Sequence, residues 1–436
     1  MKIVSSEMKN VLPTAHLKIL NAAVDLSQQM DTDLYLVGGC VRDIMLGLNE
    51  SEFDIDLTGS SIDRGFATTL ADKLNGAVTS SSVFGTHKLS VPVGLGNNLE
   101  IDLARCRSET YKNPGALPEV DSGDIFQDLD RRDFSIAAMC IVLRSPKNQG
   151  WQYGQLIDPH CGYDDLINKQ LRVLHKNSFI DDPTRMFRLI RYSCRLGFDI
   201  EESTRKTFES SVNWVTNISG DRVRHELEKI FEEKEVGLIL YTCVKLGLLP
   251  AFFTELSCDH LKEFRDMLYS DSLDQDRVEF WLGLFAINAD KTQLEYLSQT
   301  LNLSSKQNNV INDLCALNEQ LKQNEESLVA DNLKRSVIYK FLLGYNLTAI
   351  RVCAATTSNK SIKTLLEIYL NSLINTNLYL SGEDLISLGM SKGPEIGELL
   401  NDLLYAKLDG QLESADQEIQ FVKDHIFNLK DGINLD

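Results

Sequence analysis

The spacing of apolar and polar side chains divides the chain into two regions of different predicted structure. In roughly the first 160 residues, short apolar or alternating runs such as Leu34–Val37, Lys88–Val93 and Leu99–Leu103 have strand character and alternate with helical stretches. From about Asp164 onward, Leu, Ile, Phe and Tyr recur every three or four residues with few prolines, which is typical of helices. The pattern predicts an α/β domain followed by an all-helical remainder.

The segment Arg107–Asp130 interrupts the first region. It contains Asn113-Pro114-Gly115, Pro118 and Ser122-Gly123, which are residues typical of turns. A loop of this length inside a compact domain is usually functional or disordered. We therefore predict a long loop here.

The composition is that of a globular protein of two to four domains. The chain has 436 residues, of which 43% are hydrophobic and 25% charged. No apolar stretch approaches the ~20 residues of a membrane span, and the N-terminal residues lack the pattern of a signal or transit peptide. We expect a cytoplasmic protein without membrane contact; the sequence does not predict its oligomeric state.

Cysteine and histidine spacing bears on which metals the chain could bind. The nine cysteines are scattered without a CxxC pair and the seven histidines are dispersed, so we predict neither a disulfide framework nor a zinc site. Any metal should be a hard ion held by oxygen ligands.

The net charge of −19 sets a condition on any nucleic-acid partner. The charge is uneven: residues 1–250 carry −7 and residues 251–436 carry −12. A surface that binds RNA would therefore have to be a local basic stripe on an acidic protein.

Two glycines, Gly38 and Gly39, follow the first strand and open a helix that contains Arg42. Glycines let the backbone approach a ligand closely, and a helix N-terminus with an arginine in its first turn favours phosphate. The alternative is an ordinary strand-to-helix turn with a solvated arginine.

Two acids, Asp54 and Asp56, lie two positions apart in an alternating run that begins at Phe53. Side chains two apart on a strand face the same way, and two adjacent carboxylates repel unless a cation such as Mg²⁺ lies between them. Glu100 and Asp102 repeat the spacing on a later strand, and we predict Glu100 as the third carboxylate of a two-metal site. The alternative is a solvated acidic strand face.

Two further motifs are rich in arginine. Arg131, Arg132 and Asp133 end the long segment, and they could hold a triphosphate and a ribose hydroxyl or form a surface ion pair. Asp182 precedes a proline and a helix, which is also a capping position. Arginines without acidic partners in one line along that helix suggest an anionic ligand; these are Arg185, Arg188, Arg191 and Arg195.

In this order, these segments resemble the class II tRNA nucleotidyltransferase and bacterial poly(A) polymerase family. The matching segments span residues 34–231 and read LVGGCVRDIMLG, FDIDLTG, RRDFSIAAM, DPHCGYDDL, DDPTRMFRLIRYSCRLGF and GDRVRHELEKIF. A later stretch, LYLSGEDLISLGMSKGPEIGELL, resembles the tail of the tRNA-specific members.

The resemblance implies three domains. Residues 1–160 would form a catalytic α/β head of the polymerase-β-like nucleotidyltransferase fold, and residues 161–240 a helical neck that selects the nucleotide and binds RNA. Residues 241–436 would form a helical body and tail that bind tRNA.

The resemblance also implies an activity and roles for single residues. The activity is addition of C and A from CTP and ATP to the 3′ end of tRNA, with two Mg²⁺ ions on Asp54 and Asp56 and with Glu100 beside them. An Asp182/Arg185 pair would favour C and A because both bases offer an amino donor beside a ring-nitrogen acceptor. The predicted nucleotide-binding residues are Gly38, Gly39, Arg42, Arg132, Asp133, Asp182, Arg185, Arg188 and Arg191.

Two positions depart from the family pattern, and several functions stay open. Ala137 stands where the family usually has Asn, and Cys161 replaces the first glycine of a predicted hinge. The alternatives are an A-only or CC-only tRNA enzyme, a poly(A) polymerase, and a non-catalytic tRNA-binding protein of the same fold. An acidic helical interaction protein is a further alternative.

Overall fold

A computed structural model describes residues 2–48, 54–82, 85–94, 96–145, 150–266, 276–330 and 333–432. Phe53, the start of the predicted acidic strand, lies outside these residues. The chain divides into two compact units, Met1–Leu268 and Tyr269–Asp436, here called the first and second unit. The domain boundaries near residues 160 and 240 stay predictions.

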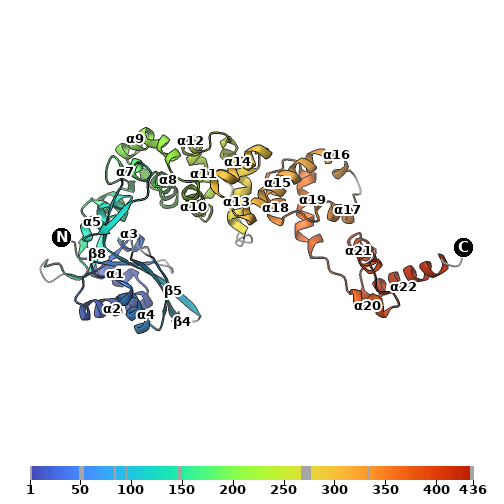
Figure 1. The fold of residues 1–436 in the computed structure, drawn as a ribbon, viewed down its shortest axis with the longest axis horizontal. Coiled ribbons are helices and arrows are strands. Elements are labelled where there is room, and N and C mark those ends of the chain that lie inside the picture. The colour runs from blue at the N-terminus through green and yellow to red at the C-terminus, as the bar shows by residue number, and fades with distance from the viewer. Residues whose placement is uncertain are drawn as a thin grey trace. The chain divides into compact units, whose positions relative to one another are not determined.

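The first unit is built on a mixed seven-stranded sheet in the order β3-β4-β5-β2-β1-β8-β9 (Figure 1). Neighbouring strands are antiparallel except β2 and β5, which run parallel. The strands are β1 Leu34–Val37, β2 Ile55–Gly59, β3 Ala77–Ser81, β4 Thr86–Gly94, β5 Asn97–Arg105, β8 Cys140–Arg144 and β9 Leu156–Ile157.

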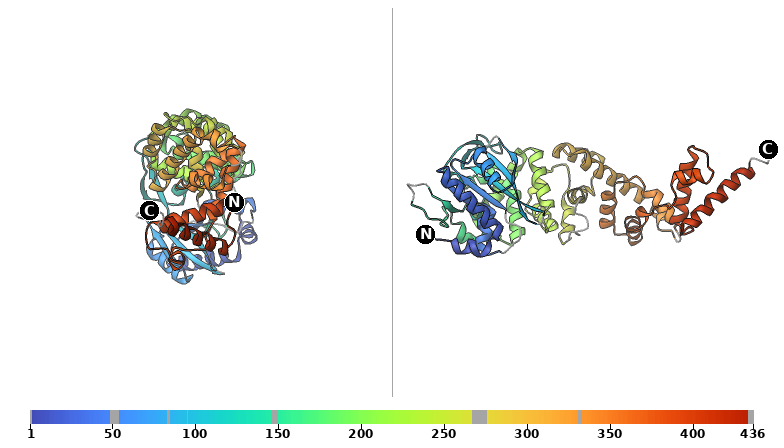
Figure 2. Two further views of the ribbon diagram at one scale, coloured as in Figure 1. Left: turned by 90° about the vertical axis from the view of Figure 1, so that its right-hand side faces the viewer. Right: turned by 90° about the horizontal axis from the view of Figure 1, so that it is seen from below.

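Helices cover one face of this sheet. Helix α2 (Thr14–Gln29) packs on β8, and helix α4 (Arg64–Lys73) packs on β3 and β4. The two helices also contact each other (Figure 2). Ile55 and Leu57 of β2 are buried, as predicted for the apolar side of that strand. Alternation along the strand therefore places Asp56 on the opposite face.

The opposite face carries a second apolar cluster. Tyr35 and Val37 of β1 pack there with Ile125 and Leu129 of helix α5, Ile125–Asp130. Because Val37 pairs in register with Asp56, this cluster and the acidic side chain share one face of the sheet. Helix α5 covers part of that face, and the acidic part beside it belongs to a cavity.

The prediction of a long loop over Arg107–Asp130 is wrong. The segment forms an antiparallel hairpin, β6 Arg107–Thr110 and β7 Glu119–Ser122, followed by α5. Asp124 and Gln127 form a capping box that starts α5, and Gly115 turns the hairpin with φ 72°. Short strands between turn residues escape periodicity analysis because they hold too few apolar positions.

The rest of the first unit is helical, with one qualification to the all-helical prediction. Two-residue strands β10, Gln170–Leu171, and β11, Asp199–Ile200, pair in parallel. The remaining elements are α1 Ser5–Val11, α3 Gly39–Leu46, η1 Ser135–Ala137, α6 Gly162–Ile167, α7 Ser178–Asp181, α8 Thr184–Leu196, α9 Glu202–Ser211, η2 Val212–Asn217, α10 Gly220–Phe231, α11 Val236–Lys245, α12 Leu248–Phe252 and η3 Asp259–Phe264.

The described part of the second unit contains helices only. Near its C-terminal end, Leu385, Leu399, Leu403 and Val422 form part of a separate apolar cluster. The elements are α13 Arg277–Ala286, α14 Lys291–Leu301, α15 Ser305–Gln323, α16 Glu325–Leu328, α17 Arg335–Leu342, α18 Leu347–Thr356, α19 Lys360–Asn371, η5 Leu373–Asn375, α20 Gly382–Ser387, α21 Glu395–Leu408 and α22 Ala415–Gly432.

Among the described helices, none is by itself long and apolar enough to cross a membrane. Helices α17 and α18 reach that length and composition only as a pair, and the chain bends by 114° between them.

Candidate active site

The turn between β1 and α3 lies directly against one of the predicted metal ligands. Gly38 has φ 78° and ψ −150°, a conformation that only glycine adopts easily. A β-carbon at this position would lie 2.3 Å from Asp56 Oδ2. The sequence predicted a close approach to a ligand at Gly38, and the group that approaches most closely is the carboxylate of Asp56.

A second acid lies beside Asp56. The parallel register of β2 and β5 pairs Asp56 with Asp102, and both carboxylates are partly buried. Burial raises the pKa of Asp56 to about 6, and the neighbouring charge of Asp102 adds to this effect. Glu100 is exposed. We therefore replace Glu100 with Asp102 as the candidate third carboxylate, because the strand register sets which acid faces Asp56.

Two more charged groups border this acidic pair. Asp54 is exposed, immediately before β2, and its charge also raises the pKa of Asp56. Lys88 of β4 lies 3.3 Å from Asp102 Oδ2, and its side chain is half exposed. Lys88 therefore offsets only part of the negative charge on Asp102.

A cavity of about 200 Å³ opens over the acidic pair. Within the described part of the chain, two buried polar atoms of its lining have no hydrogen-bond partner: Asp102 Oδ1 and Arg132 Nε. Buried polar atoms without partners are costly, so an acceptor and a donor left open in one cavity indicate a ligand. The lining residues are Val37, Asp56, Leu57, Thr58, Thr86, Asp102, Ala104, Arg107, Asp128, Arg131 and Arg132.

The predicted arginine pair is held by a buried acid rather than exposed at the surface. Asp128 Oδ1 accepts hydrogen bonds from Arg131 Nε at 3.0 Å and Nη2 at 2.8 Å, and Asp128 Oδ2 accepts one from Arg132 Nη2 at 3.0 Å. Burial alone would raise the pKa of Asp128, but Arg132 and Arg131 outweigh burial and lower it. Asp128 thus stays ionised and fixes both guanidinium groups.

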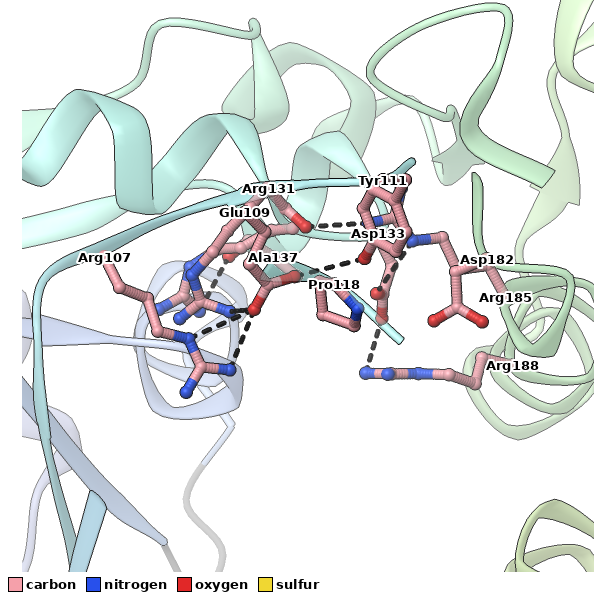
Figure 3. Close-up of a pocket in the computed structure, with 11 residues that line it drawn as sticks. Arg107, Glu109, Tyr111, Pro118, Arg131, Asp133, Ala137, Asp182, Arg185 and Arg188 are labelled. Atoms are coloured by element: carbon pink, nitrogen blue, oxygen red, sulfur yellow. Dashed lines mark hydrogen bonds and ion pairs between the residues drawn. The ribbon is translucent and has the colours of Figure 1, made fainter. Parts of the chain in front are cut away.

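A larger cavity of about 350 Å³ adjoins the first, since Arg107, Arg131 and Arg132 line both. Figure 3 shows Arg107 at one end of the larger cavity and Asp182 with Arg185 at the other. The lining residues are Arg107, Glu109, Tyr111, Pro118, Arg131, Arg132, Asp133, Ala137, Asp182, Arg185 and Arg188.

Asp182 has the capping contacts that the sequence predicted. Its Oδ1 accepts hydrogen bonds from the backbone N–H of Thr184 at 3.0 Å and from Thr184 Oγ1 at 2.6 Å, at the start of α8. Arg222 of α10 also donates to Asp182 Oδ1, at 2.6 Å. The capping prediction is confirmed, and the role of Asp182 toward a ligand stays a prediction.

The arginines of α8 are paired with acids, so the interpretation of an uncompensated stripe is wrong. Arg188 Nη2 lies 2.5 Å and Arg185 Nε lies 3.6 Å from the carboxylate of Asp133. Arg191 Nη1 lies 3.1 Å from Glu233 Oε1, and Arg195 lies 3.8 Å from the same atom. The acids come from segments distant in sequence, which spacing along one helix cannot show.

Arg191 does not line the cavity, contrary to the prediction. Arg191 lies six residues after Arg185, which is less than two full helical turns. Its side chain therefore points about 120° away from that of Arg185 around the helix axis. Its guanidinium also contacts the ring of Tyr192, 4.8 Å from the centroid. Arg191 therefore connects α8 to Glu233, two residues after the end of α10, rather than facing the larger cavity.

Arg42 and Gly39 line neither cavity in this structure. Arg42 Nε and Nη2 donate to the two oxygens of Asp43 at 2.8 and 2.9 Å, a bidentate pair. A β-carbon on Gly39 would lie 3.4 Å from Arg42 Nη2. The nucleotide contact predicted for these two residues stays a prediction.

Family models match three successive parts of the chain. The Poly A polymerase head domain matches residues 34–172, and the probable RNA and SrmB-binding site of polymerase A matches residues 197–259. The putative tRNA nucleotidyltransferase domain 2 matches residues 274–422.

Known proteins match along nearly the whole chain. The A-adding tRNA nucleotidyltransferases of Geobacter sulfurreducens and Halalkalibacterium halodurans are 30% and 29% identical over 95% and 97% of this chain. The chain spans 47% of the first relative and 95% of the second. The solved structure of the Thermotoga maritima CCA-adding enzyme complexed with tRNA is 28% identical and has a TM-score of 0.73, covering 98% of this chain and 100% of that one.

The chain belongs to the class II tRNA nucleotidyltransferase family. The two departures from the family pattern have separate places in the structure. Ala137 lines the larger cavity, and its carbonyl accepts a long hydrogen bond of 3.4 Å from Arg132 Nη1. Cys161 precedes α6 with φ 56°, a conformation that favours the glycine usual in the family.

The sequence analysis named Asp102 but preferred Glu100, and it missed three charged residues that line the cavities: Arg107, Glu109 and Asp128. A local signal existed for Asp128, which lies three and four residues before Arg131 and Arg132. Arg107 and Glu109 are two apart on β6, so they share one face of that strand. The assumption that this segment is an irregular loop concealed their alternation.

Proposed function

We propose that the chain adds C and A nucleotides to the 3′ end of tRNA from CTP and ATP, releasing pyrophosphate. The observation that carries this proposal is that two neighbouring cavities share Arg107, Arg131 and Arg132 in their linings. The acids Asp56 and Asp102 line the smaller cavity at one end, and the Asp182/Arg185 pair lines the larger cavity at the other end. A nucleoside triphosphate needs both ends: a place for metal-bound phosphates and a place for the base.

The acidic end fits Mg²⁺. No three His, Cys, Asp or Glu side chains among the described residues converge closely enough to hold a metal by themselves. Mg²⁺ is commonly bound by one or two carboxylates with substrate phosphates and water completing its octahedron. Asp54, Asp56 and Asp102 supply hard oxygen donors, and Asp102 Oδ1 has no other partner among the described residues. We therefore expect the Mg²⁺ site to be completed only when the triphosphate binds and adds its phosphate oxygens.

The residues of the site divide the reaction between them. We infer that Asp54 and Asp56 would hold Mg²⁺ and that Arg132 neutralises charge on the triphosphate. Bound Mg²⁺ would supply Lewis acidity, which lowers the pKa of the tRNA 3′-hydroxyl and offsets charge on the leaving pyrophosphate. Binding of the phosphates at the acidic end and of the base at the Asp182/Arg185 end would then align the α-phosphorus with the tRNA 3′-hydroxyl for in-line attack.

Base choice would come from the Asp182/Arg185 end. Arg222 and Thr184 occupy Asp182 Oδ1, which leaves Oδ2 as an acceptor for the amino group of C or A. Arg185 Nη1 and Nη2 each donate to the protein, to Ser178 Oγ and the Arg131 carbonyl, and each retains a second proton. Arg185 therefore retains N–H donors for a ring nitrogen.

A product assay tests the function and separates its alternatives. Purified protein is incubated with Mg²⁺ and tRNA ending at the discriminator base, or with tRNA ending in CC, and with CTP, ATP or both. CCA, CC-only and A-only enzymes give different product lengths, and a poly(A) polymerase extends beyond one A. Absence of any incorporation would leave the non-catalytic alternatives.

Aspartate variants test the metal assignment in the same assay. Asp54→Ala and Asp56→Ala should abolish incorporation, while affinity for tRNA changes little because these acids would contact metal rather than RNA. Asp72→Ala, in helix α4 on the other face of the sheet, is the matched control. Normal turnover in either site variant would remove the metal assignment.

A further inference from the structure

The hairpin that replaces the expected loop brings one arginine to the junction of the two cavities. Arg107 begins β6 and lines both cavities together with Arg131 and Arg132. Its side chain is partly exposed, and its backbone N–H lies 3.4 Å from Asp128 Oδ1. The hairpin therefore adds a third guanidinium group to the two supplied by the arginine pair.

A buried acid orients this arginine. Glu109 Oε1 accepts hydrogen bonds from Arg107 Nε at 3.1 Å and Nη2 at 2.9 Å, and from Arg131 Nη1 at 3.3 Å. Tyr111 donates to the other oxygen of Glu109 at 3.1 Å. With both carboxylate oxygens engaged and the side chain buried, Glu109 is held in one place (Figure 3).

The hydrogen bonds leave one edge of Arg107 open. Its Nε and Nη2 donate to Glu109, whereas Nη1 has no hydrogen bond to another described residue. A guanidinium fixed along one edge presents the remaining donors without loss of rotamer freedom. Phosphate oxygens are the preferred partners for such a group in an arginine-rich cavity.

We propose that Arg107 contacts the triphosphate of the incoming nucleotide and that Glu109 is the positioning residue that aims it. The inference rests on the proposed function, because it places the phosphates between the acidic end and the Asp182/Arg185 end. Arg107 comes from the hairpin and Arg132 from the segment after α5. The hairpin is thereby a part of the nucleotide site rather than only a neighbour of it.

Kinetics of single variants test the contact. Arg107→Ala should raise KM for ATP or CTP roughly tenfold or more, as expected for loss of a charge-assisted hydrogen bond, and should leave KM for tRNA unchanged. Arg105→Ala is the matched control: Arg105 is an exposed arginine two residues earlier that donates to the Ser60 carbonyl and lines neither cavity. Equal nucleotide KM values for the two variants would overturn the proposal.

A double-mutant cycle tests the positioning role. Glu109→Gln should raise the nucleotide KM when Arg107 is present and have no further effect in an Arg107→Ala background. An equal effect in both backgrounds would mean that Glu109 acts through Arg131, which would overturn the assignment. Tyr111→Phe removes a single hydrogen bond to Glu109 and should give a smaller KM increase if the glutamine variant does not fold.

A direct measurement of nucleotide binding distinguishes failure of this inference from failure of the proposed function. ATP binding measured by calorimetry with Mg²⁺ and without tRNA should weaken in Arg107→Ala and stay unchanged in Arg105→Ala. Failure of the proposed function would appear as wild-type protein that does not extend tRNA. Failure of the inference would appear as active wild-type protein and an Arg107→Ala variant with wild-type ATP affinity.

Discussion

Asp182 and Arg222 lie 40 positions apart in the sequence and are joined by a 2.6 Å contact between Asp182 Oδ1 and Arg222 Nη2. Arg222 Nη1 also donates to the carbonyl of Gly115 at 2.7 Å. One arginine of α10 thus connects the turn of the β6–β7 hairpin to the carboxylate proposed to select the base. Because this contact uses Oδ1, the hydrogen-bonding character of the other oxygen can be changed by itself.

Asp182→Asn should weaken discrimination against UTP and GTP. The amide oxygen can still accept from Arg222 and Thr184, which leaves the amide nitrogen as a donor where the native group accepts. Because each good base contact contributes about 1–3 kcal/mol, discrimination should fall roughly 5- to 150-fold in competition assays. Asp181→Asn is the control, since Asp181 faces His175 and lines neither cavity. Unchanged selectivity would limit Asp182 to capping α8.

Gly38→Ala should reduce incorporation strongly. The added β-carbon would lie 2.3 Å from Asp56 Oδ2, so the carboxylate or the turn must move. A displacement of about 1 Å in a reacting group can lower the rate ~100-fold. Gly47→Ala, at a left-handed position with nothing within 4 Å, is the control for alanine at a positive φ without a steric clash. Comparable single-turnover rates in the two variants would contradict this explanation.

Asp128→Asn should destabilise the first unit by about 3–5 kcal/mol at neutral pH, because it removes the charged partner of Arg132 and leaves Arg131 with Glu109 alone. The pKa of Asp128 is lowered in the folded protein, so its stabilising effect is present above the unfolded pKa, about 3.9. That effect is lost as pH falls through the folded pKa. The difference between wild type and variant in urea unfolding should therefore be constant near pH 7 and shrink below about pH 4. A pH-independent difference would be inconsistent with the charge-based explanation.

Cys161→Gly should raise the free energy of unfolding by up to about 1 kcal/mol. A non-glycine residue at φ 56° and ψ 34° costs about 1–2 kcal/mol, of which the greater unfolded-state entropy of glycine cancels part. Cys161→Ala keeps the β-carbon and should give no gain. Thermal unfolding of the three proteins compares them, and equal melting temperatures for the glycine and alanine variants would rule out backbone strain as the cause.

The sequence alone determined the local part of this protein. Alternation of apolar and polar residues placed Asp56 on one face of its strand and Ile55 in the core, because strand side chains repeat every two residues. Gly38 and Gly39 indicated the turn before α3, since few other residues adopt such a conformation. The ordered motifs together identified the family, although each motif had an ordinary structural alternative.

Tertiary structure alone decided which charged groups meet. The register of β2 and β5, strands about 46 positions apart, places Asp102 rather than Glu100 beside Asp56. Asp133 reaches Arg185 and Arg188 across the fold, so the arginines of α8 are paired rather than free. Local propensity and periodicity carry no information on these pairings, because they depend on the register and packing of segments distant in sequence.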